Sequence, residues 1–197
     1  MKKCLMYALV TLAILMVCTA AAASGWVVPG NGSSGTTGVS SGYSMDAKLI
    51  EDLATRSGPS TQYTGCGFYK IKGQTVRAVS RAFDNGGVQW VAVEFSYSGA
   101  ICRVYTGAQR LNLSASQLAR LPEEDMTSYI GYGTVNTNVN PKWGPGSGYA
   151  TYTDRTLSKG TRVAVIRSEN GYSMVECYHT NGEILRSWIP SYDLDLD

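Results

Sequence analysis

The sequence is poor in the residue types from which most catalytic and metal sites are built. His179 is the only histidine among 197 residues, which excludes zinc motifs that need two histidines. The five cysteines occur singly in separate segments, without the close pairs that usually ligate a metal ion. We therefore expect neither a metal site nor a cofactor.

Only one nucleophile and base stand close together, Cys177 and His179. Side chains two apart share one face of a strand, but their Cβ atoms are about 7 Å apart. That separation exceeds hydrogen-bond reach, and no third group is placed to orient the imidazole. We expect a non-catalytic protein.

An excess of charge of one sign is also missing. The chain has 17 basic and 15 acidic residues, and the numbers become equal once Lys2 and Lys3 are set aside. Nucleic-acid-binding surfaces usually carry a basic excess, and anionic membranes attract clusters of basic residues. We therefore expect neither nucleic acid nor a membrane surface as a partner.

The one long apolar run, Cys4 to Val17, is shorter than the roughly 20 residues of a membrane-spanning helix. Two lysines precede it and four alanines follow it, the pattern of a secretory signal peptide. We expect residues 1–23 to be removed and the protein to be secreted or associated with the cell surface, without membrane insertion. The bulky Val17 argues against lipid anchoring at Cys18.

After the leader, residues 24–45 are dominated by glycine, serine and threonine. Such a composition cannot bury a core and predicts a flexible linker. The glycines between Gly30 and Gly42 are not followed by the Lys-Ser/Thr pair of a phosphate-binding loop.

What the chain does contain is an internal duplication. Four blocks recur in the same order, at offsets between 82 and 87. They are Arg56-Ser57-Gly58-Pro59 with Tyr63 and Lys142-Trp143-Gly144-Pro145 with Tyr149; Lys72-Gly73-x-x-Val76 and Lys159-Gly160-x-x-Val163; Trp90-x-x-Val93-Glu94 and Tyr172-x-x-Val175-Glu176; Gly99-x-Ile101-x-Arg103-x-Tyr105 and Gly182-x-Ile184-x-Arg186-x-Trp188. We expect two domains, residues 46–112 and 129–197, joined by a linker at 113–128, with a longer loop near 82–87 in the first.

Local signals predict an all-β fold. Valine- and tyrosine-rich runs predict strands at 76–79, 88–95 and 100–105 in the first copy, and at 162–166, 173–178 and 184–189 in the second. Residues 46–54 fit a helix or a strand, and alignment with the second copy favours the strand. Ser114-x-x-Gln117 resembles a capping box, which predicts a short helical linker ending before Pro122. Five short strands in each copy predict a small, strongly bent barrel.

Together, the blocks resemble the bacterial Src-homology-3-like domain. Leu53-Ala54-Thr55-Arg56-Ser57-Gly58-Pro59 with Tyr63 is similar to the opening of that family, and Ser187-Trp188-Ile189-Pro190-Ser191-Tyr192-Asp193-Leu194 is similar to its end. The resemblance implies a five-stranded barrel in each copy. It also implies contact with peptides or glycan of cell-wall peptidoglycan, since such domains usually attach exported proteins to the wall and commonly accompany a wall hydrolase. Outside the leader, the linkers and the two copies no stretch is left for a separate catalytic domain, so we expect an exported, non-catalytic binding protein. The alternative is an interaction or regulatory module for another exported protein.

Recurring aromatic residues are the candidate binding residues. Such rings offer rigid contact area with a polar tip and suit a shallow groove, but they also close small cores. Both interpretations are open for Tyr63, Trp90, Tyr105, Trp143, Tyr149, Tyr172 and Trp188. Of these, Trp143 stands in a predicted turn and is expected to be the most exposed. Arg56, Arg103 and Arg186 either bind a carboxylate ligand or form solvated salt bridges, and we favour the salt bridges.

Cys66, Cys102 and Cys177 remain after removal of the leader, so at most one intrachain disulfide can form. Export permits a disulfide, and Cys66–Cys102 is the candidate pair because both lie in one copy. The alternative is three small buried apolar side chains.

Overall fold

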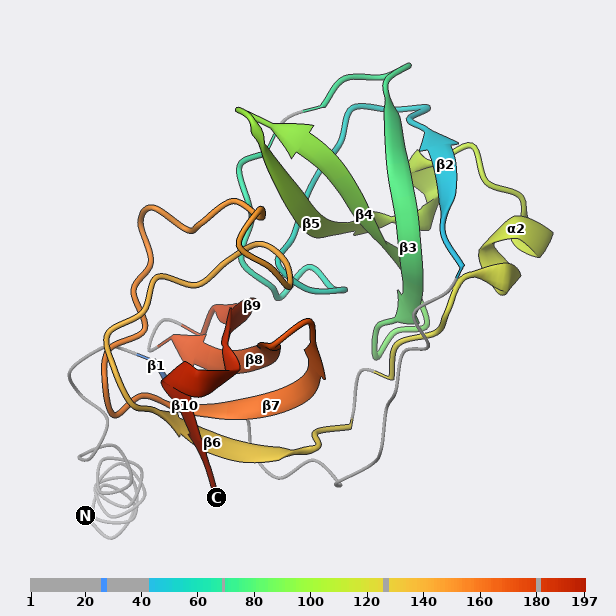
Figure 1. The fold of residues 1–197 in the computed structure, drawn as a ribbon. Helices are drawn as coiled ribbons and strands as arrows, with labels where there is room; N and C mark the ends of the chain where they lie inside the picture. Colours follow the sequence, from blue (N-terminus) through green and yellow to red (C-terminus); the bar gives the residue numbers. More distant parts are fainter. Residues whose placement is uncertain (1–25, 28–42, 69, 126–127, 180–181) are drawn as a thin grey trace, which may run out of the picture.

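The computed structural model describes residues 26–27, 43–68, 70–125, 128–179 and 182–197. The expected signal peptide at 1–23, Cys18 and most of the expected linker at 24–45 lie outside these residues. The described chain is mostly β-structure in two antiparallel sheets, which confirms the all-β prediction. Figure 1 shows the sheets as two lobes. We call residues 43–112 the first half and 129–197 the second half.

Each half contributes most of one sheet. The four-stranded sheet has the order β2 (Met45–Lys48), β3 (Thr75–Phe83), β4 (Gln89–Tyr97) and β5 (Ala100–Gly107). The six-stranded sheet has the order β1 (Trp26–Val27), β8 (Tyr172–His179), β7 (Arg162–Glu169), β6 (Gly131–Val135) and β10 (Leu194–Leu196), with β9 (Ile184–Pro190) paired to β8. The six strands predicted from sequence are therefore present.

The duplication is visible in the strand register. Glu94 lies opposite Arg103 across β4 and β5, and Glu176 lies opposite Arg186 across β8 and β9. A register shift interrupts β3 between Ala78 and Ser80, and an equivalent shift interrupts β7. The two halves therefore share strand pairing as well as sequence.

Turn residues explain where the strands reverse. Ser98 and Gly99 both have positive φ, 49° and 84°, the backbone of the tight turn that joins β4 and β5. In the first half the turn between β3 and β4 is longer, as predicted. The Asp84 carboxylate accepts hydrogen bonds from the backbone N–H groups of Gly86 and Val88, which lowers the pKa of Asp84.

Residues 46–54 are only partly a strand. β2 ends at Lys48, and Leu49 continues its pairing as a single bridge to Leu111. Beyond Leu49 the chain is irregular up to Ala54. The strand prediction for this segment is therefore correct at its start and wrong at its end.

Between the two sheets the chain forms α2 (Ala115–Arg120), which begins at a capping box made by Ser114 and Gln117. Short 3-10 turns, η1 (Ala108–Arg110) and η2 (Ser191–Asp193), follow β5 and β9 at equivalent positions. In the described ranges, the helices are too short or too polar to cross a membrane.

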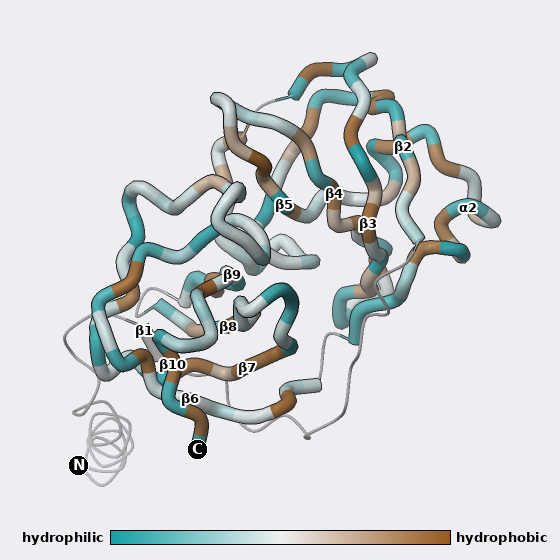
Figure 2. Tube along the Cα trace, in the orientation of Figure 1, coloured by the Kyte–Doolittle hydropathy of each residue, from teal (hydrophilic) through white to brown (hydrophobic). Residues whose placement is uncertain are grey.

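One hydrophobic core passes through both halves. Its buried members include Val93 and Val104 of the first sheet and Val175 and Leu185 of the second. Figure 2 shows hydrophobic segments in strands of both lobes, for example along β7 and next to the β5 label. A repeat of about 65 residues buries only ~60% of its unfolded surface, so sharing a core compensates for the small size of each half.

Candidate functional site

The Gly-Pro-x-x-x-Tyr block forms the same compact loop in each half. In the first half, the Tyr63 N–H donates to the Ser60 carbonyl at 3.3 Å, and the ring of Tyr63 lies against Gly58. A Cβ at Gly58 would stand 2.2 Å from that ring, and one at Gly144 would stand 1.9 Å from the ring of Tyr149. The motif therefore requires glycine because the tyrosine ring occupies the side-chain space.

Each loop pairs with the other half of the molecule. The Thr64 N–H donates to the carbonyl of Ile184 in β9 at 2.8 Å. Reciprocally, the Ala150 N–H donates to the carbonyl of Ile101 in β5, also at 2.8 Å. Ile101 and Ile184 are equivalent positions, so the contact has the reciprocity of a two-fold interface. Main-chain bonds to a strand edge hold the two halves together.

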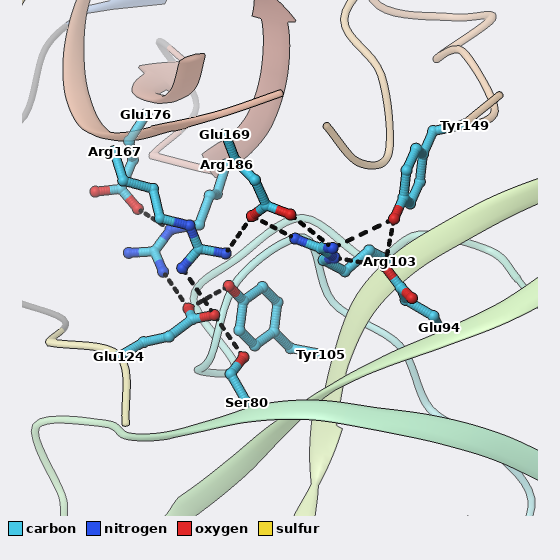
Figure 3. A network of polar contacts seen from close by, with 10 residues as sticks. All are labelled: Ser80, Glu94, Arg103, Tyr105, Glu124, Tyr149, Arg167, Glu169, Glu176 and Arg186. Atoms are coloured by element: carbon cyan, nitrogen blue, oxygen red, sulfur yellow. Dashed lines mark hydrogen bonds and ion pairs between the residues drawn. The ribbon is translucent and has the colours of Figure 1, made fainter. Parts of the chain in front are cut away.

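The tyrosine of each loop reaches an arginine–glutamate pair in the other half. Arg103 Nε donates to Glu94 at 2.7 Å, and the hydroxyl of Tyr149 donates to the same carboxylate. Arg103 also forms an ion pair with Glu169 of β7 at 3.0 Å. Figure 3 shows these contacts on the right of the network. Burial lowers the pKa of Arg103, but hydrogen bonding to Glu169 and the charge of Glu94 outweigh it and raise that pKa.

The equivalent contact in the second half is more deeply buried. Arg186 Nε donates to Glu176 at 3.2 Å, and Arg186 Nη2 donates to the hydroxyl of Tyr63 at 3.2 Å. Arg186 and Glu176 are only 3% and 2% exposed. A charge this deeply buried requires a partner in place, so the second pair depends on the packing of the two halves.

Glu124, from the segment that follows α2, lies between the two halves. Its carboxylate accepts hydrogen bonds from Ser80 and from the hydroxyl of Tyr105, each at 2.5 Å, and forms an ion pair with Arg167 at 3.0 Å. A more distant contact joins it to Arg186 at 3.8 Å. Burial alone would raise the pKa of Glu124. The charges of the two arginines and the hydrogen bonds from the two hydroxyls stabilise the carboxylate more strongly, so its pKa is lowered to about 2. The segment that connects the two sheets therefore supplies a charge to the interface (Figure 3).

Most of the aromatic residues predicted as binding residues are buried. Tyr63, Trp90, Tyr105, Trp143 and Trp188 are each less than a tenth exposed, and Tyr149 and Tyr172 are partly buried. The expectation that Trp143 is the most exposed is wrong, because its ring stacks on Tyr152 at 3.5 Å and is covered by Phe68. Tyr63 and Tyr149 lie at the interface between the halves.

A different set of rings reaches the surface. Phe68 lies at the centre of an aromatic cluster, with ring centroids 5.0 Å from Tyr97 and 4.8 Å from Trp143. Phe95 and Tyr152 complete the cluster. Tyr97 is 37% exposed and Phe68 is partly exposed. Sequence comparison between the copies missed Phe68 and Tyr97 because neither has an aromatic counterpart in the second copy.

The candidate arginines form internal contacts. Arg103 and Arg186 lie in the ion pairs described above, as the salt-bridge interpretation predicted, but their side chains are mostly buried rather than solvated. Arg56 donates from Nη1 to the carbonyl of Tyr63 at 3.2 Å and thereby supports the loop. Among the described residues, no three histidine, cysteine, aspartate or glutamate side chains are grouped to hold a metal ion.

The three cysteines in the described part of the chain, Cys66, Cys102 and Cys177, are free thiols. The candidate disulfide Cys66–Cys102 is therefore not formed, because Cys102 is directed into the core as a small apolar side chain and Cys66 lies at its edge. Burial raises the pKa of Cys102 to about 11 and also raises the pKa of Cys66 and Cys177. Cys177 is wholly buried, which leaves its thiol inaccessible to a substrate beside His179.

We expect thiol reagents to react slowly with the folded chain at pH 8, because the thiolate is the reactive form and all three thiols are protonated. In urea, residues 24–197 should release three equivalents of a chromogenic disulfide reagent, with Cys66, Cys102 and Cys177 reacting at the rate of a free peptide. One equivalent in urea without a reductant would contradict the free-thiol state and indicate a disulfide.

No protein-family model matches this chain, and no curated protein is significantly similar to it. The functional argument therefore depends on the residues and geometry described above.

Proposed function

We propose that this protein is an exported, non-catalytic binding protein that contacts peptides of cell-wall peptidoglycan. In this proposal, each half is a five-stranded Src-homology-3-like barrel, α2 belongs to the linker, and the reciprocal loops make the two barrels one unit. The single observation that carries the proposal is the partly exposed aromatic cluster around Phe68 and Tyr97. Exposed rings held by buried ones give a ligand contact area at little cost in conformational entropy.

The proposal predicts that residues 24–197 sediment with purified peptidoglycan. Phe68→Ala and Tyr97→Ala should each reduce the bound fraction several-fold, because each removes a ring from the exposed part of the cluster. Tyr192→Ala is the matched control, since Tyr192 is an 80% exposed aromatic residue on η2. Its loss should leave binding unchanged.

Two results would overturn the proposal. If the wild-type chain stays in the supernatant, an exported protein partner replaces the wall as the ligand. If all three variants bind as the wild type does, the aromatic cluster is not the contact surface. Near-ultraviolet circular dichroism of each variant checks that the fold is retained.

A further inference from the structure

We infer that the duplicated chain has one ligand site rather than two, built across the boundary of its halves, and that this site takes a short peptide with a free carboxylate. The inference rests on the proposed function and deepens it by assigning the ligand's chemistry. The aromatic cluster together with Lys70 forms the site.

Both halves contribute to the aromatic cluster. Phe68, Phe95 and Tyr97 belong to the first half, whereas Trp143 and Tyr152 belong to the second. Trp143 is carried by the loop that pairs with β5, where its carbonyl accepts a hydrogen bond from the Arg103 N–H at 2.7 Å. Its ring is stacked on Tyr152, which is only 2% exposed. The second half thus provides a rigid support behind the partly exposed Phe68.

Lys70 adds a positive charge to the cluster. Its ammonium group lies 5.4 Å from the centroid of the Phe95 ring, and its backbone is fixed by the hydrogen bond from the Leu53 N–H to its carbonyl at 2.8 Å. Within the described ranges, Lys70 has no ion-pair partner. A cation beside apolar rings complements a carboxylate next to small apolar groups. A neutral sugar would use the rings but not the charge.

The second half lacks an equivalent site. The hydrogen bond from Val139 to Leu157 corresponds to that from Leu53 to Lys70, so a buried leucine replaces the lysine. Because Leu157 corresponds to Lys70, the residue two positions earlier, Arg155, corresponds to Phe68. The other ring positions of the cluster also lack an aromatic equivalent in the other copy. Phe95 corresponds to Cys177 and Tyr97 to His179 in the second half, and Trp143 corresponds to Ser57 in the first half. At the positions equivalent to this cluster, the second half of the described chain therefore does not repeat its rings.

Calorimetric titration of residues 24–197 tests the site, with N-acetyl-D-alanyl-D-alanine and its C-terminal amide as probes. We expect one equivalent of the acid to bind per chain, and the amide to bind at least tenfold more weakly. Phe68→Ala and Lys70→Met should each weaken binding of the acid at least tenfold. Tyr192→Ala, at an exposed ring outside the cluster, should bind as the wild type does.

Several outcomes would overturn the inference: two equivalents per chain, equal binding of acid and amide, no detectable binding of the acid, or an unaffected Lys70→Met. Binding of neutral chitotetraose that depends on Phe68 would assign the site to glycan instead. Sedimentation with whole peptidoglycan separates the two proposals. If Lys70→Met still sediments with the wall, the inferred site is wrong and the proposed function stands. If the wild type fails to sediment, the proposed function is wrong.

Discussion

Glu124→Gln should lower the free energy of unfolding by about 3–5 kcal/mol, the range for removing one partner of a buried ion pair. The neutral amide would leave the guanidinium of Arg167 without its 3.0 Å carboxylate partner, and only the more distant contact with Glu169 at 3.7 Å would remain. Arg167 and Glu124 are only 8% and 5% exposed, so the lost partner is poorly replaced by solvent. Urea unfolding of residues 24–197 at pH 7 measures the change.

Glu123→Gln is the matched control for this substitution. Glu123 precedes Glu124 in the same segment and pairs with Arg81 at 2.7 Å, but its side chain is 53% exposed. Exposed pairs contribute about 0–1 kcal/mol, so this variant should unfold close to the wild type. Equal losses in the two variants would show that burial of Glu124 does not set its contribution.

From the lowered pKa of Glu124 we predict how the free energy of unfolding depends on pH. The pKa of Glu124 is about 2 in the folded protein, against about 4.3 in an unfolded chain. Because folding lowers this pKa, the stabilisation from ionised Glu124 is complete above about pH 4.3. It is lost as the pH falls toward 2. Between pH 5 and pH 2, unfolding free energies of Glu124→Gln should therefore decline less steeply than those of the wild type. If the unfolding free energies of the wild type and Glu124→Gln fell in parallel, the pKa of Glu124 would not be lowered by folding.

Gly144→Ala is expected to have the second large effect, a loss of at least about 1–3 kcal/mol, the usual cost of overpacking. The new Cβ would lie 1.9 Å from the ring of Tyr149, so the ring must move. That movement would break its hydroxyl contacts with Glu94 and Arg103 across the interface. Thermal unfolding followed by near-ultraviolet circular dichroism reports both the stability and the packing of the rings.

Gly148→Ala separates the steric effect from a general effect of alanine in this loop. Gly148 is in the same loop, and a Cβ there would meet no atom within 4 Å, so its replacement should be nearly neutral. In the double variant Gly144→Ala with Tyr149→Ala, the clash is absent and the two losses should be less than additive. Full additivity would mean that the ring is not what excludes a side chain at Gly144.

Strands and turns could be predicted from the sequence because their causes are local. Alternating apolar residues and the glycine of Ser98-Gly99 act over a few residues, and β3, β4 and β5 form where those signals lie. The duplication was equally readable, since both halves use the same hydrogen-bonded loop. Residues 50–54 depart from this local reasoning, because after Leu49 the main chain pairs only through separate hydrogen bonds, from the Ile50 N–H to the Arg110 carbonyl and from the Leu53 N–H to the Lys70 carbonyl.

Whether each aromatic ring is buried or exposed could not be predicted from the sequence. Repetition of Tyr63 as Tyr149 indicates a shared role, but a ring suited to a groove is equally suited to an interface. Trp143 is buried by Phe68, a residue 75 positions earlier, and by Tyr152. Contacts of this kind depend on how two folded units pack, which periodicity and composition do not encode.

By itself, the sequence determined that this chain is all-β and internally duplicated, with a Gly-Pro-x-x-x-Tyr block in each copy. Only the tertiary structure decided that the two halves exchange these loops, that Glu124 completes a buried network, and that the cluster around Phe68 and Tyr97 reaches the surface. The physical reason is the distance along the chain over which each kind of interaction acts. Strand and turn preferences act between near neighbours along the chain, whereas burial and charge pairing depend on residues that only folding brings together.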